Sequence, residues 1–186
     1  MNLQNKKVLF ILPHDDFRDK EYSWIVERFD EAGIAHEVAS SHLSEIKGLF
    51  GTIVKPDVSI NFVSSGDYDA FIFVGEEAAS EYYEVPEIVK LVINALATRK
   101  VVAAIGRAVP ILGFSGKLTG LKVTGPDEIR HEIEGAGAFF TGRIVEQDGD
   151  VITASGPYAV RELAESVIKA LEWSDGDSKS GRPYLR

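Results

Sequence analysis

Residues 100–112 have the pattern of a turn that presents a reactive side chain. Five small or branched apolar residues, 101–105, predict a strand that is buried on both faces. Gly106 follows, and Pro110 then falls in the first turn of an apolar segment, where a helix tolerates proline. A strand, a one-residue corner and a helix hold a nucleophile over the carboxyl edge of a sheet. That corner normally carries serine or cysteine, whereas glycine has no side chain that could attack a substrate.

The composition narrows the possible chemistry further. The chain has 186 residues, no cysteine, and 29 acidic against 20 basic residues, for a formal net charge of -9. The lack of cysteine excludes disulfides, thiolate metal sites and cysteine nucleophiles. The acidic balance, without a run of Lys and Arg among aromatic residues, argues against nucleic acid and anionic membranes as partners. The first apolar run, residues 8–12, is too short for a signal peptide or a membrane span, so we expect a cytoplasmic protein.

Apolar runs alternate with helical patterns along the chain. Buried strands are predicted in four runs: 8–12, 35–40, 70–74 and 101–105. Helices with one apolar face are predicted over three stretches: from residue 22 to a stop at Gly33, over 88–96, and from Gly156-Pro157 through residue 171. Strands that alternate with helices and are apolar throughout predict a mostly parallel sheet covered on both faces, an α/β fold with three α/β/α layers.

Shorter elements fill the remaining sequence. We expect a loop at 13–16, a hairpin or edge element within 49–60, a short strand at 121–124, a short helix from Pro126 to Glu134, and a hairpin around Asp148-Gly149-Asp150. One domain is expected over residues 1–173. Residues 174–186 are rich in Ser, Gly and Asp and predict a loose tail.

Polar or glycine residues follow three of the predicted strands. They are residues 14–18, Gly75 with Glu76, and Gly106 with Arg107. In parallel sheets, ligands bind beyond the carboxyl ends of the strands. We therefore expect these three segments to meet at one site.

The order and spacing of these pieces resemble the DJ-1/PfpI superfamily, whose fold is flavodoxin-like. The resemblance covers about residues 6–172 and rests on four segments taken together: 6–12, 69–75, 100–112 and 148–157. Members of that family are described as peptidases, chaperones, glyoxalases or deglycases, and they commonly form dimers or higher assemblies. The resemblance therefore implies a homo-oligomer, with a homodimer as the expected state.

The family's functional residues are largely replaced in this chain. By the resemblance, the nucleophilic cysteine falls on Gly106, and the residue after it, often histidine, falls on Arg107. The acidic side chain that usually hydrogen-bonds the cysteine falls on Arg18, and a pair of glycines becomes Gly75-Glu76. An arginine frequent before the last helix falls on Ser155. Peptidase, glyoxalase and deglycase chemistry need a thiolate that attacks a carbonyl. We therefore expect a non-catalytic member that uses no cofactor.

Two interpretations of the charged residues remain open. Arg18 and Arg107 near exposed amides would bind a small anion, a carboxylate or a phosphate. Alternatively, Arg18, Arg107 and Glu76 form an ion-pair network that fills the pocket. Both hold if Glu76 pairs with one arginine and leaves the other free. A third hypothesis is an enzyme without cysteine chemistry, in which Glu76 or His14 is the general acid or base.

Other candidate groups are weaker. His14, Asp15 and Asp16 could ligate a metal, but adjacent residues on one loop rarely converge on an ion, so no metal is expected. Ser115 lacks the Gly-x-Ser-x-Gly spacing of a hydrolase, and Ser155 could pair only with His14.

Three aromatic residues, Trp24, Tyr82 and Tyr83, could form a stacking surface for a planar ligand. Aromatic residues at helical spacing more often belong to the core or to a subunit interface. We favour an interface, because members of the resembled family commonly form dimers or higher assemblies.

Overall fold

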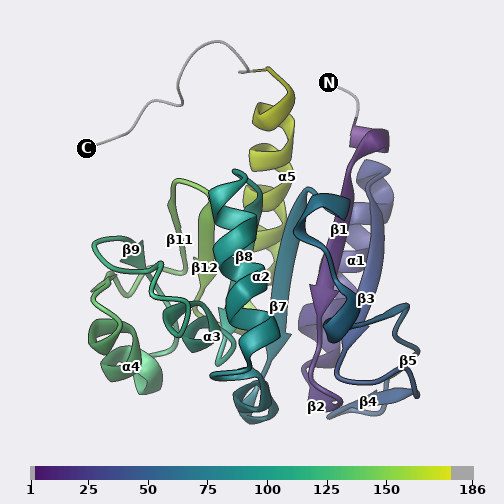
Figure 1. The fold of residues 1–186 in the computed structure, drawn as a ribbon, viewed down its shortest axis with the longest axis horizontal. Coiled ribbons are helices and arrows are strands. Elements are labelled where there is room, and N and C mark those ends of the chain that lie inside the picture. Colours follow the sequence, from purple (N-terminus) through teal and green to yellow (C-terminus); the bar gives the residue numbers. More distant parts are fainter. Residues whose placement is uncertain (1–2, 177–186) are drawn as a thin grey trace.

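The computed structural model describes residues 3–176, which form a central seven-stranded sheet between two layers of helices (Figure 1). The strand order is β11-β12-β8-β7-β1-β3-β6, and all neighbours are parallel except β11 and β12. The strands are β1 (Lys7–Ile11), β3 (Ala35–Ser40), β6 (Val58–Ser59), β7 (Ala70–Gly75), β8 (Val101–Gly106), β11 (Val145–Asp148) and β12 (Val151–Ala154). The expected flavodoxin-like α/β sandwich is confirmed.

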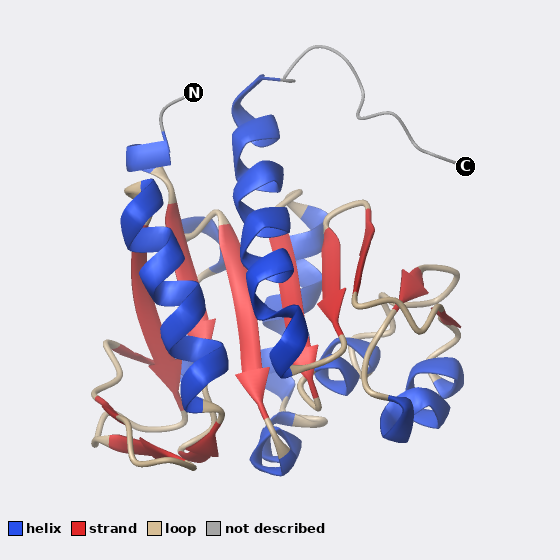
Figure 2. Cartoon of the chain, turned by 180° about the vertical axis from the view of Figure 1, so that it is seen from behind, coloured by secondary structure: helices blue, strands red, loops and turns tan. Residues whose placement is uncertain are grey.

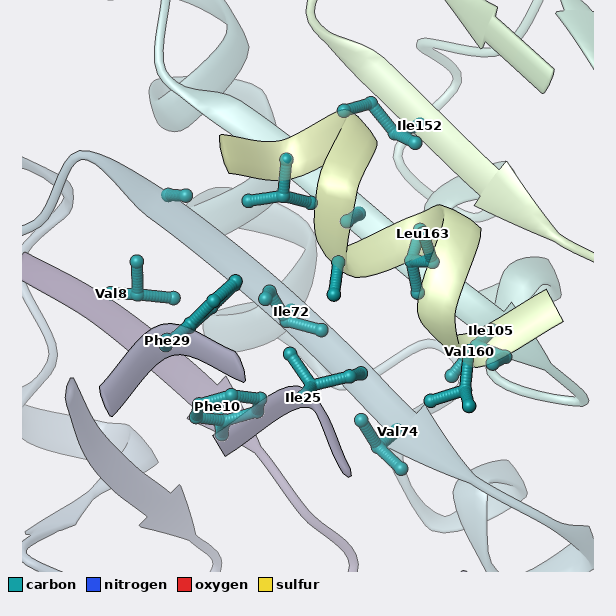
Figure 3. Packing of buried hydrophobic residues seen from close by; sticks show 14 of the residues in the cluster. Val8, Phe10, Ile25, Phe29, Ile72, Val74, Ile105, Ile152, Val160 and Leu163 are labelled. Atoms are coloured by element: carbon teal, nitrogen blue, oxygen red, sulfur yellow. The ribbon is translucent and has the colours of Figure 1, made fainter. Parts of the chain in front are cut away.

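Helices cover the two faces of the sheet. Helices α1 (Asp19–Ala32) and α5 (Val160–Gly176) lie side by side on one face, and α2 (Pro86–Ala97) and α3 (Val109–Gly113) lie on the other (Figures 1 and 2). Alternation along the strands builds a separate apolar core on each face: Val8 and Phe10 point to α1 and α5, and Leu9 points to the opposite side. Figure 3 shows the first core, in which Phe29 of α1 and Leu163 of α5 pack over the strands.

The sequence of helix α1 explains where the helix begins, which face it buries and where it ends. The helix also forms one wall of the candidate site described below. Ile25 and Phe29 are fully buried, one helical turn apart. Gly33 ends the helix in the left-handed region, with φ of 72°, and its N–H donates to the Asp30 carbonyl. Asp19 and Glu21 lie in the first turn, where carboxylates complement the helix dipole.

The shorter elements agree with the predictions in most places. A second sheet consists of β2 (Asp15–Phe17), β4 (Ile46–Gly48) and β5 (Ile53–Val54). The region 49–60, expected to hold a hairpin or edge element, therefore contains β5 of the β4–β5 hairpin and β6, the edge strand of the main sheet. Strand β9 (Lys122–Val123) pairs with β10 (Phe139–Phe140). The short helix after Pro126 is η5 (Asp127–Ile129) followed by α4 (Arg130–Gly135). The other 3-10 helices are η1 (Leu3–Asn5), η2 (Ile60–Phe62), η3 (Ser65–Asp67), η4 (Glu77–Tyr82) and η6 (Pro157–Ala159).

Two local expectations need correction. The loop predicted at 13–16 is partly strand, because Phe17 is fully buried and β2 pairs with β4 from Asp15 onward. The last helix continues to Gly176, three residues past the expected end of the domain at 173. The rest of the predicted tail, 177–186, lies outside the described residues.

In the described part of the chain, no helix is long and apolar enough to cross a membrane.

Candidate functional site

Gly106 stands at the corner predicted from the sequence. It ends β8 beside Gly75 of β7, and α3 begins three residues later with Pro110 in its first turn. The backbone of Gly106 is left-handed, with φ of +62°, a conformation that side-chain-bearing residues rarely adopt. A Cβ built there would meet only the Gly75 carbonyl oxygen at 3.7 Å and Glu21 Oε1 at 3.9 Å. The corner therefore has room for a side chain that this chain does not carry.

The helix after the corner is short. α3 spans five residues, little more than one turn. Because the macrodipole sums aligned peptide units, so short a helix contributes little to the field at its N-terminus. The charge of the site must come from side chains.

A cavity of about 550 Å³ opens over the corner. Arg18, Glu76, Gly106, Arg107 and Ser155 all line it, so the structure brings the segments after β1, β7, β8 and β12 together. Gly75 lies beside Gly106 in the sheet register. Its Cβ would come within 2.8 Å of the Ala79 side chain, which explains why this position is glycine.

Arg18 and Glu76 form an ion pair across the cavity. The Nε of Arg18 donates to Oε1 of Glu76, and both side chains are partly buried. This hydrogen bond to the carboxylate raises the pKa of Arg18 above its usual value. The charge of Arg18 is thus already compensated within the chain.

Arg107 has a different environment. Its backbone carbonyl accepts a hydrogen bond of 2.8 Å from the Tyr83 hydroxyl, which fixes the backbone just after the corner. Within residues 3–176, its guanidinium has no hydrogen bond or ion pair. Glu76 therefore pairs with Arg18 and leaves Arg107 unpaired at the cavity, which is the arrangement that makes the two interpretations of the sequence compatible.

Glu21 is the residue that sequence reasoning missed. Its side chain is 1% exposed, and neither carboxyl oxygen makes a hydrogen bond in the described structure. Oε1 lies 4.0 Å from the Arg18 Nε and faces the space over Gly106. Burial raises the pKa of Glu21 to about 8, with Arg18 lowering and Glu76 raising it in smaller measure. Burial thus favours the neutral, protonated form of the Glu21 carboxyl near pH 7.

Comparison with known proteins decides the family. The family model described as "DJ-1/PfpI family" matches residues 6–170. The chain belongs to the DJ-1/PfpI family. An uncharacterized protein of Methanocaldococcus jannaschii is 34% identical over 175 residues, covering 92% of this chain and 85% of the relative. A protein of Thermococcus kodakarensis named as a deglycase is 34% identical over 172 residues, covering 89% of this chain and 99% of the relative.

Solved structures share the fold of the DJ-1/PfpI chain. A ThiJ/PfpI domain protein from Brachyspira murdochii superposes with a TM-score of 0.87 at 24% identity, covering 90% of this chain and 96% of that one. The Drosophila melanogaster DJ-1beta structure gives a TM-score of 0.79 at 22% identity, covering 92% and 96%. At these identities the likeness shows the fold alone.

The structure corrects one correspondence drawn from the DJ-1/PfpI resemblance. The acidic partner of the nucleophile position is Glu21, not a position replaced by Arg18, because the Glu21 carboxyl lies next to Gly106 and Arg18 is the cap residue before α1. The short strand β2 changes the path of the chain between β1 and α1, which displaces a residue-by-residue alignment there. A signal was present: Glu21 precedes Ile25 and Phe29 at intervals of four, so a charged residue falls on the apolar stripe of the helix.

Other sequence candidates have structural roles. His14 contacts Glu81, whose hydrogen bond raises the pKa of the imidazole, and it is not among the residues that line the cavity. Ser115 is buried, and its hydroxyl donates a hydrogen bond of 2.6 Å to the Leu112 carbonyl oxygen. No group of three or more His, Asp or Glu side chains among residues 3–176 is arranged to hold a metal.

The predicted aromatic surface does not form. Tyr82 is buried within the chain and donates 2.6 Å to the Leu12 carbonyl, so it is unavailable to a subunit interface. Trp24 lies on the other face, beneath the Arg161 guanidinium, which is 4.1 Å from its ring centre. Tyr83 packs against Phe114 beside the corner.

Proposed function

We propose that this chain is a non-catalytic member of the DJ-1/PfpI family that binds a small anionic ligand in the cavity over Gly106. The observation that carries the proposal is a pair of features at one corner. Glycine stands where the family nucleophile is expected, in a chain without cysteine, and the uncompensated Arg107 lines the cavity beside it. Without the thiolate, the family's attack on a carbonyl has no reagent.

The charges around the cavity support Arg107 as the anion contact. Arg18 is committed to Glu76, whereas the Arg107 guanidinium keeps its forked donors for a carboxylate. A volume of about 550 Å³ suits a small metabolite. Glu77 and Glu128 also line the cavity and limit the negative charge that it accepts, which favours a monocarboxylate over a phosphate or a dicarboxylate.

Arg107→Ala tests this function directly. Loss of a charge-assisted contact of about 1.5–3 kcal/mol should weaken the binding of small monocarboxylates such as propionate by about ten- to a hundredfold. Calorimetry or chemical-shift titration gives the affinity. Arg161→Ala, which removes an exposed guanidinium on α5, is the matched control and should leave the affinity unchanged. Equal binding by Arg107→Ala and the unchanged protein would contradict the proposal.

The enzymatic alternative keeps some support, because Glu76 lines the cavity and a relative with 34% identity is named a deglycase. The Glu76 carboxylate is already engaged by Arg18, however, and would have to leave this ion pair to act as a base. Incubation with glyoxal and with model amides decides between the two hypotheses. Turnover that disappears in Glu76→Gln would replace the binding function with catalysis.

A homodimer is a separate proposal. Phe50 and Phe62 are 77% and 83% exposed, which gives this chain apolar surface that a second copy could cover. Light scattering coupled to gel filtration measures the assembly state.

A further inference from the structure

We propose that His14 and His42 form a two-histidine site for a divalent transition-metal ion such as Zn²⁺, with water molecules completing the coordination of the ion. This site is independent of the proposed function, because neither histidine is among the residues that line the cavity over Gly106. Imidazole nitrogen is a preferred ligand of Zn²⁺, Ni²⁺ and Cu²⁺, and two imidazoles that share one ion form a chelate.

The two histidines follow neighbouring parallel strands of the main sheet. His14 lies in the segment after β1, and His42 lies in the segment after β3 (Figure 1). The main-chain N–H of Leu12 donates a hydrogen bond of 3.1 Å to the Ala39 carbonyl, so the two segments are joined just before the histidines. The centres of the two rings are 5.7 Å apart, and the ring planes meet at 61°. The sequence places His14 only beside carboxylates of its own loop, whereas the fold adds a second imidazole from another loop.

Each ring has its Nδ1 atom engaged within the chain, which leaves Nε2 as the metal-binding atom. Nδ1 of His14 contacts Oε2 of Glu81, and the hydroxyl oxygen of Ser44 lies 2.6 Å from Nδ1 of His42. Histidines that bind metals usually donate their other ring N–H to an acceptor of this kind, which fixes the tautomer and orients the ring. With the proton on Nδ1 of both rings, both Nε2 atoms keep a lone pair for the ion.

Glu81 is the positioning residue of this site. Its Oε1 accepts a hydrogen bond of 2.9 Å from the main-chain N–H of His14, so one carboxylate holds both the backbone and the ring of that residue. The next residue, Tyr82, is buried and donates a hydrogen bond of 2.6 Å to the Leu12 carbonyl, which fixes η4 to the end of β1. The His14 ring is therefore oriented before an ion binds, and less conformational entropy is lost on binding.

The charges around the two rings favour a cation. The Asp15 carboxylate is 3.5 Å from Nε2 of His14, and Asp16 and Glu81 also place negative charge near this ring. In the described part of the chain, no Lys or Arg forms an ion pair with these three carboxylates. An ion at Nε2 is thus attracted by charges that no basic side chain neutralises.

The number of protein ligands sets the strength of the site. Nowhere within residues 3–176 do three or more His, Asp or Glu side chains converge to hold a metal, so the protein provides the two imidazoles and water fills the remaining positions. We therefore expect weaker binding than at a structural zinc site with four protein ligands.

Titration of the full chain with Ni²⁺ tests the site in the unchanged protein. The chain has four histidines, and paramagnetic Ni²⁺ broadens the NMR signals of the rings that it contacts. We expect the ring signals of His14 and His42 to broaden together, at lower Ni²⁺ concentrations than those of His36 and His131. Mg²⁺, which prefers oxygen ligands, should leave all four unchanged. Equal broadening of all four rings, broadening of only one ring of the pair, or no broadening would overturn the proposal.

Calorimetry with Zn²⁺ separates a chelate from two independent imidazoles. At about pH 8, where imidazole is largely neutral, His14→Ala and His42→Ala should each weaken binding at least about tenfold. The double variant should lose little more than either single variant, because one histidine alone cannot chelate the ion. His131→Ala removes an exposed imidazole on α4 and is the matched control, which should keep the affinity of the unchanged protein. Equal affinity in all variants, or losses that add in the double variant, would contradict the shared site.

Variants of Glu81 test its positioning role. Glu81→Ala removes the acceptor and should weaken Zn²⁺ binding about ten- to a hundredfold, whereas Glu81→Gln keeps a carbonyl acceptor and should recover part of the loss. Full affinity in Glu81→Ala, or no recovery in Glu81→Gln, would refute that role. Propionate binding depends on Arg107 and should be the same in His14→Ala and in the unchanged protein. The metal site and the anion site can therefore fail separately.

Discussion

The Gly106→Cys variant is expected to carry a thiol that titrates below the ordinary cysteine pKa of about 8.5. The side chain fits, because a Cβ at this position has no contact closer than 3.7 Å. Arg107 follows it in sequence, and neutral Glu21 faces it as a hydrogen-bond donor, so both neighbours favour the thiolate. Reaction with iodoacetamide near pH 7 should accordingly be faster than for a solvent-exposed cysteine.

Gly149→Cys is a matched control for this variant. Gly149 has the same φ of +62° in the β11–β12 turn, with open space around its Cβ position. Both substitutions force a side chain into the left-handed region, at a cost of about 1–3 kcal/mol. The two sites differ in their surroundings: Gly106 is buried beside Glu21 and Arg107, whereas Gly149 is exposed. Thiolate absorbance measured against pH should give the lower pKa for Gly106→Cys, and equal values would refute the electrostatic description of the corner.

The second large effect is the pH dependence of stability. The pKa of Glu21 rises from 4.5 in the unfolded chain to about 8 in the folded protein. Between these values the folded state binds more protons than the unfolded state, so the free energy of unfolding decreases as pH rises through this window. The full pKa shift lowers the free energy of unfolding by at most about 4–5 kcal/mol, and this loss is complete once the pH is above the folded-state pKa of about 8.

Glu21→Gln should remove this loss. The amide stays neutral, but its N–H groups have no partner in the buried site, which costs about 1–3 kcal/mol at all pH values. The variant should therefore be slightly less stable than the unchanged protein near pH 5 and about 2–3 kcal/mol more stable near pH 9. Urea unfolding at both pH values measures the difference. A curve for Glu21→Gln parallel to that of the unchanged protein would mean that Glu21 is ionised in the folded state.

His14 does not disturb this comparison. Its pKa is raised by Glu81, so its contribution to stability is present below the unfolded value and is lost as pH rises through the folded one. Both proteins carry the His14–Glu81 pair. The difference between them isolates Glu21.

The sequence predicted the sheet well because its strands are continuous apolar runs. The run 35–40 coincides with β3, and 70–74 and 101–105 each end one residue short of the observed strands. Gly33, Pro110 and Gly149 also occupy the backbone positions that their types require. Local chemistry decides these features, so they can be recognised without knowledge of the fold.

The site was predicted only in part, because tertiary contacts decide its charges. Arg18, Glu76, Gly106 and Arg107 line one cavity, as the strand ends suggested. Glu76 pairs with Arg18 because of the path that the chain takes between β1 and α1. The short pairing of β2 with β4 determines that path. Glu21 became visible as a site residue only when α1 was placed over the sheet.

The cavity is assembled from parts of different origin. Its floor, at Gly106, belongs to the main sheet, whereas Asp16 and Leu49 come from or adjoin the second sheet, β2-β4-β5, and Ala78 comes from η4. Both apolar cores pack chiefly against the main sheet, so residues at the rim can be exchanged with little disturbance beneath them. The residues that contact a ligand and the residues that stabilise the fold thus lie in separate segments. Libraries of variants confined to the rim should therefore yield proteins with new ligand specificities that still fold.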